Sequence, residues 1–114
     1  MTRDPLFGPL IMFGLGGVHV ELIQDVAFRL HPLTDRDARD MVREVAGFPL
    51  LTGYRGAPEA DVEALESLLL RVSALAGDHP ELMELDLNPV KVLPRGEGCV
   101  VVDARFLLAG EEEG

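Results

Sequence analysis

The chain has 114 residues, which is enough for one domain with a modest core. Apolar residues make up 47% of it, which argues against a disordered chain. Its formal net charge of −10 argues against a nucleic-acid partner, because binding a phosphate backbone needs a basic face. Lys91 is the only lysine, so a phosphate site built from lysines cannot be complete within this chain. A nucleotide held through a metal remains compatible with the charge, since hard cations prefer oxygen ligands.

The single cysteine, Cys99, excludes a disulfide framework and a cysteine-ligated zinc site within one chain. Because it lies in an apolar run, we expect a buried structural thiol. The sequence shows no signal-peptide pattern, and its apolar runs stay below the ~18 residues needed to span a bilayer. We therefore expect a cytoplasmic protein without a membrane partner.

The first third of the chain predicts strands. Residues 1–9 are polar and turn-rich, and we expect a linker leading into the domain. The runs 10–13 and 18–22 predict two strands joined by a glycine-rich connection with positive φ angles at its tip. Residues 25–31 alternate again, with Val26, Phe28 and Leu30 on one face. The opposite, polar face is where we expect a ligand. Its members are His19, Glu21, Arg29 and His31.

The rest of the chain predicts two helices and a hairpin. Thr34 and Asp37 have the spacing of a capping box, which predicts a helix over 34–46. An irregular loop over 49–58 precedes a second helix from about 59 to 76, which has a broad apolar stripe. Strands at 82–87 and 99–106 flank turn residues at 94–98, and 109–114 form an acidic tail. This order predicts an α+β domain with helices packed on a largely antiparallel sheet.

The final hairpin gives the sharpest functional hypothesis. If its turn is centred near Gly96, antiparallel pairing places Asn88 almost opposite Asp103. Cross-strand neighbours lie about 5–7 Å apart, so their oxygens can share one divalent cation. Mg²⁺ takes only one or two protein oxygens and completes its shell with water and phosphate. The alternative is that Asn88-Pro89 is simply a turn and Asp103 an exposed strand residue.

An ordered set of segments resembles a known family over nearly the whole chain. The segments are Phe7-Gly8-Pro9, Phe13-Gly14-Leu15-Gly16-Gly17, Glu21, Asp25-Val26-Ala27-Phe28-Arg29-Leu30, Pro32-Leu33, Leu50-Leu51-Thr52-Gly53-Tyr54-Arg55-Gly56, Glu84-Leu85-Asp86-Leu87-Asn88-Pro89 and Val102-Asp103-Ala104-Arg105. Together they resemble the C-terminal ATP-grasp part of ADP-forming acyl-CoA synthetases and, more distantly, the succinyl-CoA synthetase β-subunit. The resemblance implies an ATP-grasp C-terminal subdomain over 10–108. It also implies that Asn88 and Asp103 hold the Mg²⁺ of the nucleotide.

Further candidate site residues lie in the glycine-rich loop, on the polar face of the strands and in the loop over 49–58, each with an alternative. Gly14, Gly16 and Gly17 form a loop that either approaches phosphate closely or makes a tight hairpin turn. Arg29 would neutralise phosphate charge and Glu21 would orient it or hold a nearby water; the alternative is that the two form a cross-strand ion pair. Arg55 is either a mobile phosphate contact or a solvated side chain, and we favour the latter. The three histidines match no phosphoryl-carrier motif, so no residue is assigned a catalytic role.

The resemblance implies a ligase that forms acyl-CoA, ADP and phosphate from an acid, CoA and ATP. Its cofactors would be Mg²⁺ and ATP or ADP. The chain corresponds to half of a nucleotide clamp, so we expect it to need an ATP-grasp N-terminal lobe and CoA-binding domains, and to be inactive alone. Two alternatives stay open. One is a regulatory, ligand-binding module like the synthetase-like part of some protein acetyltransferases. The other is a self-associating remnant that forms homo-oligomers.

Overall fold

The structure is a computed structural model that describes residues 1–15 and 25–110. Its elements are β1 (Thr2–Asp4), β2 (Gly8–Gly14), β3 (Val26–Leu30), α2 (Asp35–Glu44), the 3₁₀ turns η1 (Phe48–Leu51) and η2 (Tyr54–Gly56), α3 (Val62–Asp78), β4 (Leu82–Leu87), β5 (Val90–Val92), β6 (Cys99–Val101) and β7 (Ala104–Leu108). The predicted α+β class is confirmed.

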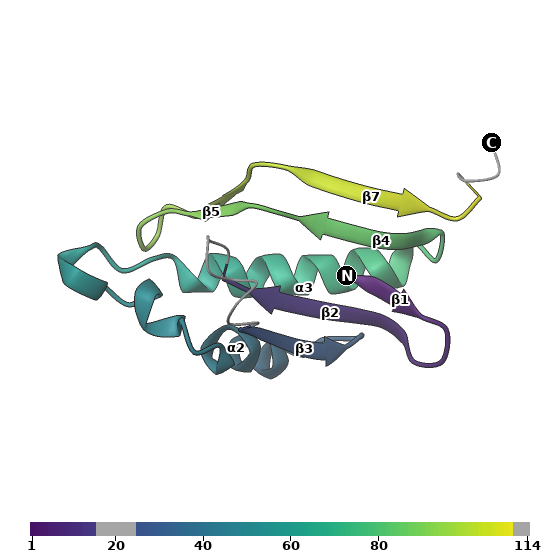
Figure 1. Cartoon of the computed structure of the whole chain (residues 1–114), viewed down its shortest axis with the longest axis horizontal. Coiled ribbons are helices and arrows are strands. Elements are labelled where there is room, and N and C mark those ends of the chain that lie inside the picture. The colour runs from purple at the N-terminus through teal and green to yellow at the C-terminus, as the bar shows by residue number, and fades with distance from the viewer. Residues whose placement is uncertain (16–24, 111–114) are drawn as a thin grey trace.

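A five-stranded antiparallel sheet in the order β3-β2-β1-β4-β7 forms one layer (Figure 1). The short strand β1 sits at its centre and connects two hairpins that are distant in sequence. On one side it pairs with β2, through Thr2 opposite Leu10, and on the other with β4, through Thr2 opposite Glu84. Beyond β4 the chain continues into the separate two-stranded sheet of β5 and β6.

Helices α2 and α3 pack on one face of the sheet and enclose the core. Its fully buried members share that interface and are Ile11, Ala27, Ala38, Met41 and Val42. Thr34 caps α2 with the predicted capping box, because its hydroxyl accepts from the Asp37 N–H and the Asp37 carboxylate accepts from the Thr34 N–H. Among the described residues, no helix is long and apolar enough to cross a membrane.

The second helix begins later than the sequence pattern predicted. It starts at Val62 rather than near Glu59, because Asp61 is its N-cap and accepts from the Ala64 N–H. Asp61 is buried although it is charged. Its other oxygen accepts from the Gly98 N–H at 2.7 Å, which fixes the start of α3 to the β5–β6 turn.

Three other segments differ from expectation or fall outside the description. Residues 1–9, expected as a linker, contain β1 and enter the centre of the sheet. The expected strand 99–106 is divided into β6 and β7, which pair with different partners. The expected strand at 18–22 and most of the acidic tail lie outside the described residues, and β2 pairs instead with β3.

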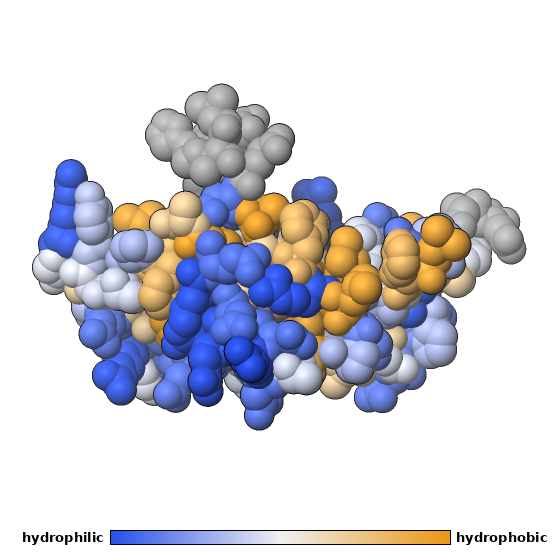
Figure 2. Space-filling view, turned by 90° about the horizontal axis from the view of Figure 1, so that it is seen from below, coloured by the Kyte–Doolittle hydropathy of each residue, from blue (hydrophilic) through white to orange (hydrophobic). Residues whose placement is uncertain are grey.

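The two faces of the sheet differ in what covers them. Alternation places Ile11 and Ala27 under the helices and Met12, Phe28 and Leu30 on the opposite face, where each is almost half exposed. Seen from the side of β3 and α2, apolar residues gather along the upper part of the molecule and hydrophilic residues cover the lower part (Figure 2). The open face over β2 and β3 is therefore markedly apolar for a surface.

Candidate nucleotide and metal site

The final hairpin places Asn88 directly opposite Asp103, as the sequence predicted. Leu87 pairs with Ala104 at the end of the β4–β7 ladder, and the Asn88 N–H donates to the Asp103 carbonyl at 3.0 Å. The Val102 N–H then donates to the Pro89 carbonyl, and β5 and β6 continue in the same register. The pairing is thus held on both sides of the interruption at Pro89, so the positions of the two residues are well defined.

Both side chains of this pair are accessible. Asn88 and Asp103 are exposed, and one Asp103 oxygen accepts from the N–H of Ala104 at 2.9 Å. That bond orients the carboxylate, and the second oxygen makes no contact with the described residues that would compete with a cation. Within residues 1–15 and 25–110 there is no cluster of three or more His, Cys, Asp or Glu suited to a metal. A cation here would therefore rely on one amide, one carboxylate and non-protein oxygens, which is the donor set that Mg²⁺ uses beside phosphate.

Charged residues continue along β4 and β7 from this pair. Asp86 lies opposite Arg105, and both are exposed on the face of the sheet away from the helices. Glu84, two residues before Asp86 in β4, lies on the same face. We did not single out Asp86 or Arg105 as site residues, although both lie in motifs that carry the family resemblance. The open face is thus apolar over β2 and β3 and charged over β4 and β7.

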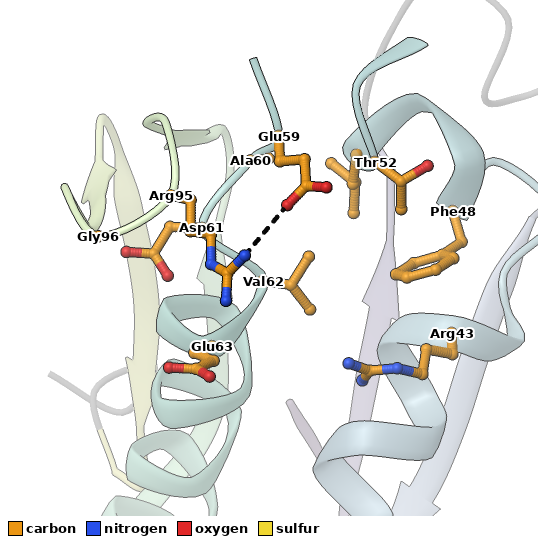
Figure 3. Close-up of a pocket in the computed structure, with 11 residues that line it drawn as sticks. Arg43, Phe48, Thr52, Glu59, Ala60, Asp61, Val62, Glu63, Arg95 and Gly96 are labelled. Carbon is orange, nitrogen blue, oxygen red and sulfur yellow. Dashed lines mark ion pairs between the residues drawn. The ribbon is translucent and has the colours of Figure 1, made fainter.

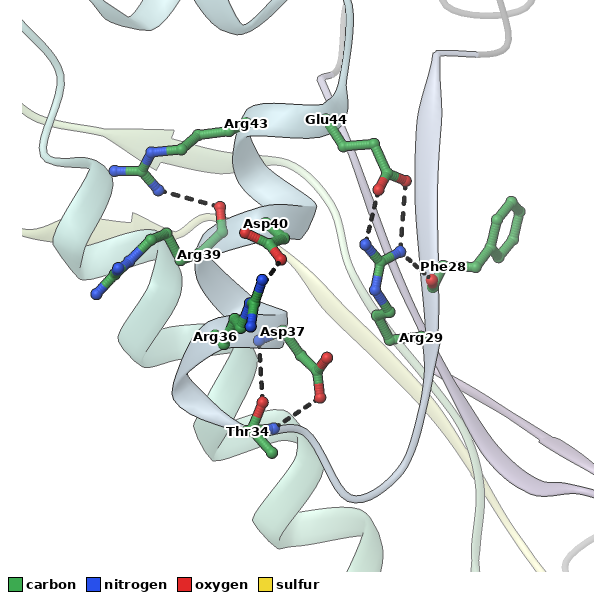
Figure 4. A network of polar contacts seen from close by, with 9 residues as sticks. All are labelled: Phe28, Arg29, Thr34, Arg36, Asp37, Arg39, Asp40, Arg43 and Glu44. Carbon is green, nitrogen blue, oxygen red and sulfur yellow. Dashed lines mark hydrogen bonds and ion pairs between the residues drawn. The ribbon is translucent and has the colours of Figure 1, made fainter.

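Arg29 lies on the helix-covered face rather than beside the hairpin pair. Its guanidinium donates to Glu44 of α2 at 2.7 Å and to the backbone oxygen of Phe28 (Figure 4). The hydrogen bond from Arg29 lowers the pKa of the Glu44 carboxyl and raises that of the guanidinium. The described partner of Arg29 is therefore a helix residue, and Arg29 ties β3 to α2.

His31 shares the face of Arg29 and is also engaged with a helix. Its Nδ1 lies 3.0 Å from the hydroxyl of Ser73 on α3, and that buried hydroxyl also accepts from the Leu33 N–H. The proposed polar ligand face is thus, at Arg29 and His31, the inner face of the sheet. Its other two members, His19 and Glu21, lie outside the described residues.

The glycine loop is described only at its first residue. Gly14 ends β2 opposite Val26, and a Cβ there would lie 2.8 Å from the Val26 side chain, so local packing already favours glycine. Gly16 and Gly17 lie outside the described residues.

Arg55, the other candidate phosphate contact, lies on an exposed turn. It adopts φ 55°, and its guanidinium stacks over the Tyr54 ring at 5.2 Å.

The single cysteine, expected to be a buried structural thiol, lies beside α3. Cys99 is half-buried, with its Sγ 3.9 Å from the Ala64 oxygen.

A pocket of about 380 Å³ lies between the C-terminal end of α2, the N-terminal end of α3 and the β5–β6 turn (Figure 3). Arg43 and Phe48 form one wall, and an ion pair joins Glu59 and Arg95 at 3.5 Å across another. Its lining includes neither Asn88 nor Asp103.

A larger groove of about 660 Å³ reaches the hairpin pair. It runs between β2 and the β4–β5 segment, with α3 as its floor and Met1 at one end. Asn88 and Pro89 line the other end. The sequence pattern gave no indication of this groove, because it depends on the pairing of β1 with strands far along the chain.

Comparison with known proteins decides the family. Residues 1–108 match the ATP-grasp domain family. The chain is 57% identical over 112 residues to acetate–CoA ligase (ADP-forming) I of Archaeoglobus fulgidus, and 52% identical over 111 residues to the β-subunit of acetate–CoA ligase (ADP-forming) II of Pyrococcus furiosus. The chain belongs to the ATP-grasp family of ADP-forming acetyl-CoA synthetases.

A solved structure supports the same assignment. The acetyl-CoA synthetase 1 of Candidatus Korarchaeum cryptofilum, in complex with coenzyme A and Mg-AMPPCP, superposes with a TM-score of 0.87 at 50% identity. That match covers 94% of this chain and 49% of the solved one. The P. furiosus match covers 96% of this chain and 47% of the subunit, and the A. fulgidus match 98% and 16%. The chain therefore spans at most about half the length of these relatives.

Proposed function

We propose that this chain supplies the Mg²⁺-binding half of the nucleotide site of an ADP-forming acyl-CoA synthetase. The observation that carries the proposal is the fixed pairing of Asn88 with Asp103 at an exposed end of the sheet. The K. cryptofilum relative, half of whose residues are identical over the match, was solved with Mg-AMPPCP. An amide and a carboxylate oxygen on directly opposite residues suit one Mg²⁺ that also carries phosphate oxygens.

The metal, when bound, would neutralise charge on the nucleotide phosphates. Asp103 contributes a carboxylate oxygen whose orientation the Ala104 N–H fixes, and Asn88 contributes its amide oxygen. The Gly14–Gly17 loop remains a proposed phosphate contact, and Glu21 remains a proposed residue that orients Arg29 or holds a nearby water. Arg29 would have to leave Glu44 to reach phosphate. Its ion pair with Glu44 therefore favours a structural role in which Arg29 joins β3 to α2.

The complete reaction requires more than this chain. Phosphoryl transfer depends on positioning and on charge neutralisation from several sides, and a half-site supplies little of either. We therefore propose that the chain acts together with a second ATP-grasp lobe and CoA-binding domains, in a synthetase that joins an acid to CoA while ATP is converted to ADP and phosphate.

The proposal is tested by calorimetric titration of the purified chain with ADP and ATP, with and without Mg²⁺. We expect Mg²⁺-dependent binding that weakens at least about tenfold in Asp103→Asn and Asn88→Ala, the loss of one good ligand interaction. The matched control is Glu97→Gln, which removes one carboxylate from the turn of the same hairpin and should change nothing. Equal binding by all variants, or no Mg²⁺-dependent binding at millimolar nucleotide, would contradict a working half-site and favour a regulatory or structural role.

A further inference from the structure

Two basic residues flank the hairpin pair, Asn88 and Asp103, one on each side along the strands. The hairpin comprises β4, β5, β6 and β7, and its two arms stay paired from the β5–β6 turn to the end of β7 (Figure 1). Lys91 in β5 lies three residues beyond Asn88, toward the turn. Arg105 in β7 lies two residues beyond Asp103, away from the turn. The pair therefore lies between two cationic side chains.

Both basic side chains lie on the open face of the sheet. Arg105 is exposed on the face away from the helices, directly opposite Asp86. Lys91 is also exposed, and its neighbours Val90 and Val92 pack against the core. Because successive side chains of a strand point to opposite faces, Lys91 is directed away from the helices. The two cations and the two oxygen donors thus share one face of the hairpin.

The spacing along the strands brings both cations close to anything bound at the pair. At about 3.3 Å per residue, the Lys91 backbone lies about 10 Å from that of Asn88, and the Arg105 backbone about 7 Å from that of Asp103. The long, flexible side chains of lysine and arginine can cover most of these separations. Phosphate groups held by a cation at the pair are therefore accessible to both basic groups, from opposite directions.

Within residues 1–15 and 25–110, neither Lys91 nor Arg105 takes part in an ion pair. Arg105 lies opposite Asp86 in the register without forming an ion pair with it. The third basic residue of the hairpin differs, since Arg95 in the turn pairs with Glu59 at 3.5 Å. The ion pairs of this part of the chain engage other basic residues, namely Arg29, Arg36, Arg43, His79 and Arg95.

The acidity of the chain gives these two cations a specific role. The net charge is −10, and Glu84 and Asp86 lie on the same face of β4, so the field of the protein repels a polyphosphate. One Mg²⁺ neutralises only part of the charge of a nucleoside triphosphate. Basic groups on either side of the metal offset the remainder, and a guanidinium can donate two parallel hydrogen bonds to phosphate oxygens.

We propose that Lys91 and Arg105 contact the phosphates of the bound nucleotide from the two sides of the hairpin pair, so that the polyphosphate lies along the hairpin. The inference rests on the proposed function for the position of the metal, and it specifies the ligand class. A nucleoside di- or triphosphate can extend toward both cations, whereas a single phosphate group is too short to contact both. Lys91 acts as a point charge, and Arg105 donates through its guanidinium.

Calorimetric titration of the full chain with Mg²⁺-ATP tests the two contacts. Lys91→Gln and Arg105→Gln should each weaken binding about fivefold, the loss of one exposed charged contact, and the double variant about 25-fold. Both slopes of affinity against salt should fall, and AMP binding should change much less. The matched control is Arg95→Gln, which removes the same charge from the turn of the same hairpin and should bind like the parent. Arg105→Lys keeps the charge and should retain part of the affinity.

A metal-free probe separates these contacts from the magnesium site. Sodium tripolyphosphate without Mg²⁺ should shift the side-chain NMR signals of Lys91 and Arg105 more than those of Arg95, in the parent and equally in Asp103→Asn, which lacks the metal-binding carboxylate. Absence of these shifts would overturn the proposal, whatever the result with nucleotide.

The nucleotide titrations give two further outcomes that contradict the contacts alone. Mg²⁺-dependent binding that is unchanged in Lys91→Gln and Arg105→Gln would leave the magnesium site standing without its flanking cations. Equal weakening in Arg95→Gln would show that net charge, rather than local contact, controls binding. Circular dichroism verifies that every variant is folded.

Discussion

The two faces of the five-stranded sheet show how the same strands can serve a core and an interface. Neighbouring residues of β2 differ completely in environment, since Ile11 is 1% exposed under the helices and Met12 is 45% exposed on the other face. In β3 and the residue that follows it, the inner face holds Ala27, Arg29 and His31, while the larger apolar side chains Phe28 and Leu30 point outward.

In β3, polar side chains lie on the inner face and large apolar side chains on the outer face, which is the opposite of the usual arrangement in a half-buried strand. The inner polar groups are satisfied by helix residues, Arg29 by Glu44 and His31 by Ser73, so burial costs little there. The outer apolar residues are the kind of surface that a partner covers. An open face that is apolar over β2 and β3 therefore favours the proposal that further parts of a synthetase cover this half of the sheet.

The largest effect should come from truncating the two neighbouring residues of β2. Ile11→Ala removes a fully buried side chain and should lower the free energy of unfolding by about 2–4 kcal/mol. Met12→Ala should cost less than about 1 kcal/mol, because its side chain is already half solvated. Urea denaturation measures both. Equal losses would mean that the open face is covered in the isolated chain, for example by self-association.

A smaller effect should follow from the polar contacts of the inner face. Ser73→Ala removes the hydroxyl that serves both His31 and the Leu33 N–H in a buried position, and should cost about 1–3 kcal/mol. The control is Ser67→Ala, an exposed serine on the same helix, which should stay within about 0.5 kcal/mol of the parent. If both variants unfold at the same urea concentration, the inner polar contacts do not stabilise β3 against α3.

Local signals in the sequence predicted the parts of the fold that depend on short-range geometry. The capping box at Thr34 and Asp37 was predicted from spacing and is confirmed. The opposition of Asn88 and Asp103 follows from the position of one turn, and the register confirms it. Both inferences involve residues whose relation is set by the intervening chain, so no knowledge of the rest of the fold is needed.

Features that depend on distant contacts could not be predicted in this way. Thr2 pairs with Glu84, and the groove between β2 and the β4–β5 segment depends on that pairing. Asp61 reads as a solvated helix residue until the Gly98 N–H is known to lie 2.7 Å from it. The inner face of β3 was misjudged for the same reason, because periodicity shows that two faces exist without showing which one the helices cover.

The partly buried Met1 amine makes the stability of the chain depend on pH. Burial lowers the pKa of the Met1 amine below its ordinary value of 8.0, against the opposing attraction of Asp86 and Glu84. The folded state then binds the proton less well than the unfolded state. Stability should therefore rise as pH increases through the folded pKa toward 8.0 and level off above it. Acetylation of the amine keeps the donor to Leu85, removes the charge, and should abolish this rise in thermal denaturation.

The smallest effect concerns the ion pair that joins the inner face to α2. Arg29 lowers the pKa of the Glu44 carboxyl below its ordinary value of 4.5, so the folded state favours the ionised form. The stabilisation is present above 4.5 and is lost as pH falls through the lowered folded value. Glu44→Gln should match the parent most closely in strong acid and be slightly less stable near neutral pH, whereas Glu97→Gln in the exposed β5–β6 turn should follow the parent throughout. The ion pair is partly solvated, so salt should reduce the difference. If Glu44→Gln keeps the parent's full stability at neutral pH and low salt, Arg29 is not held by Glu44 in solution, and it becomes available again as a contact for phosphate.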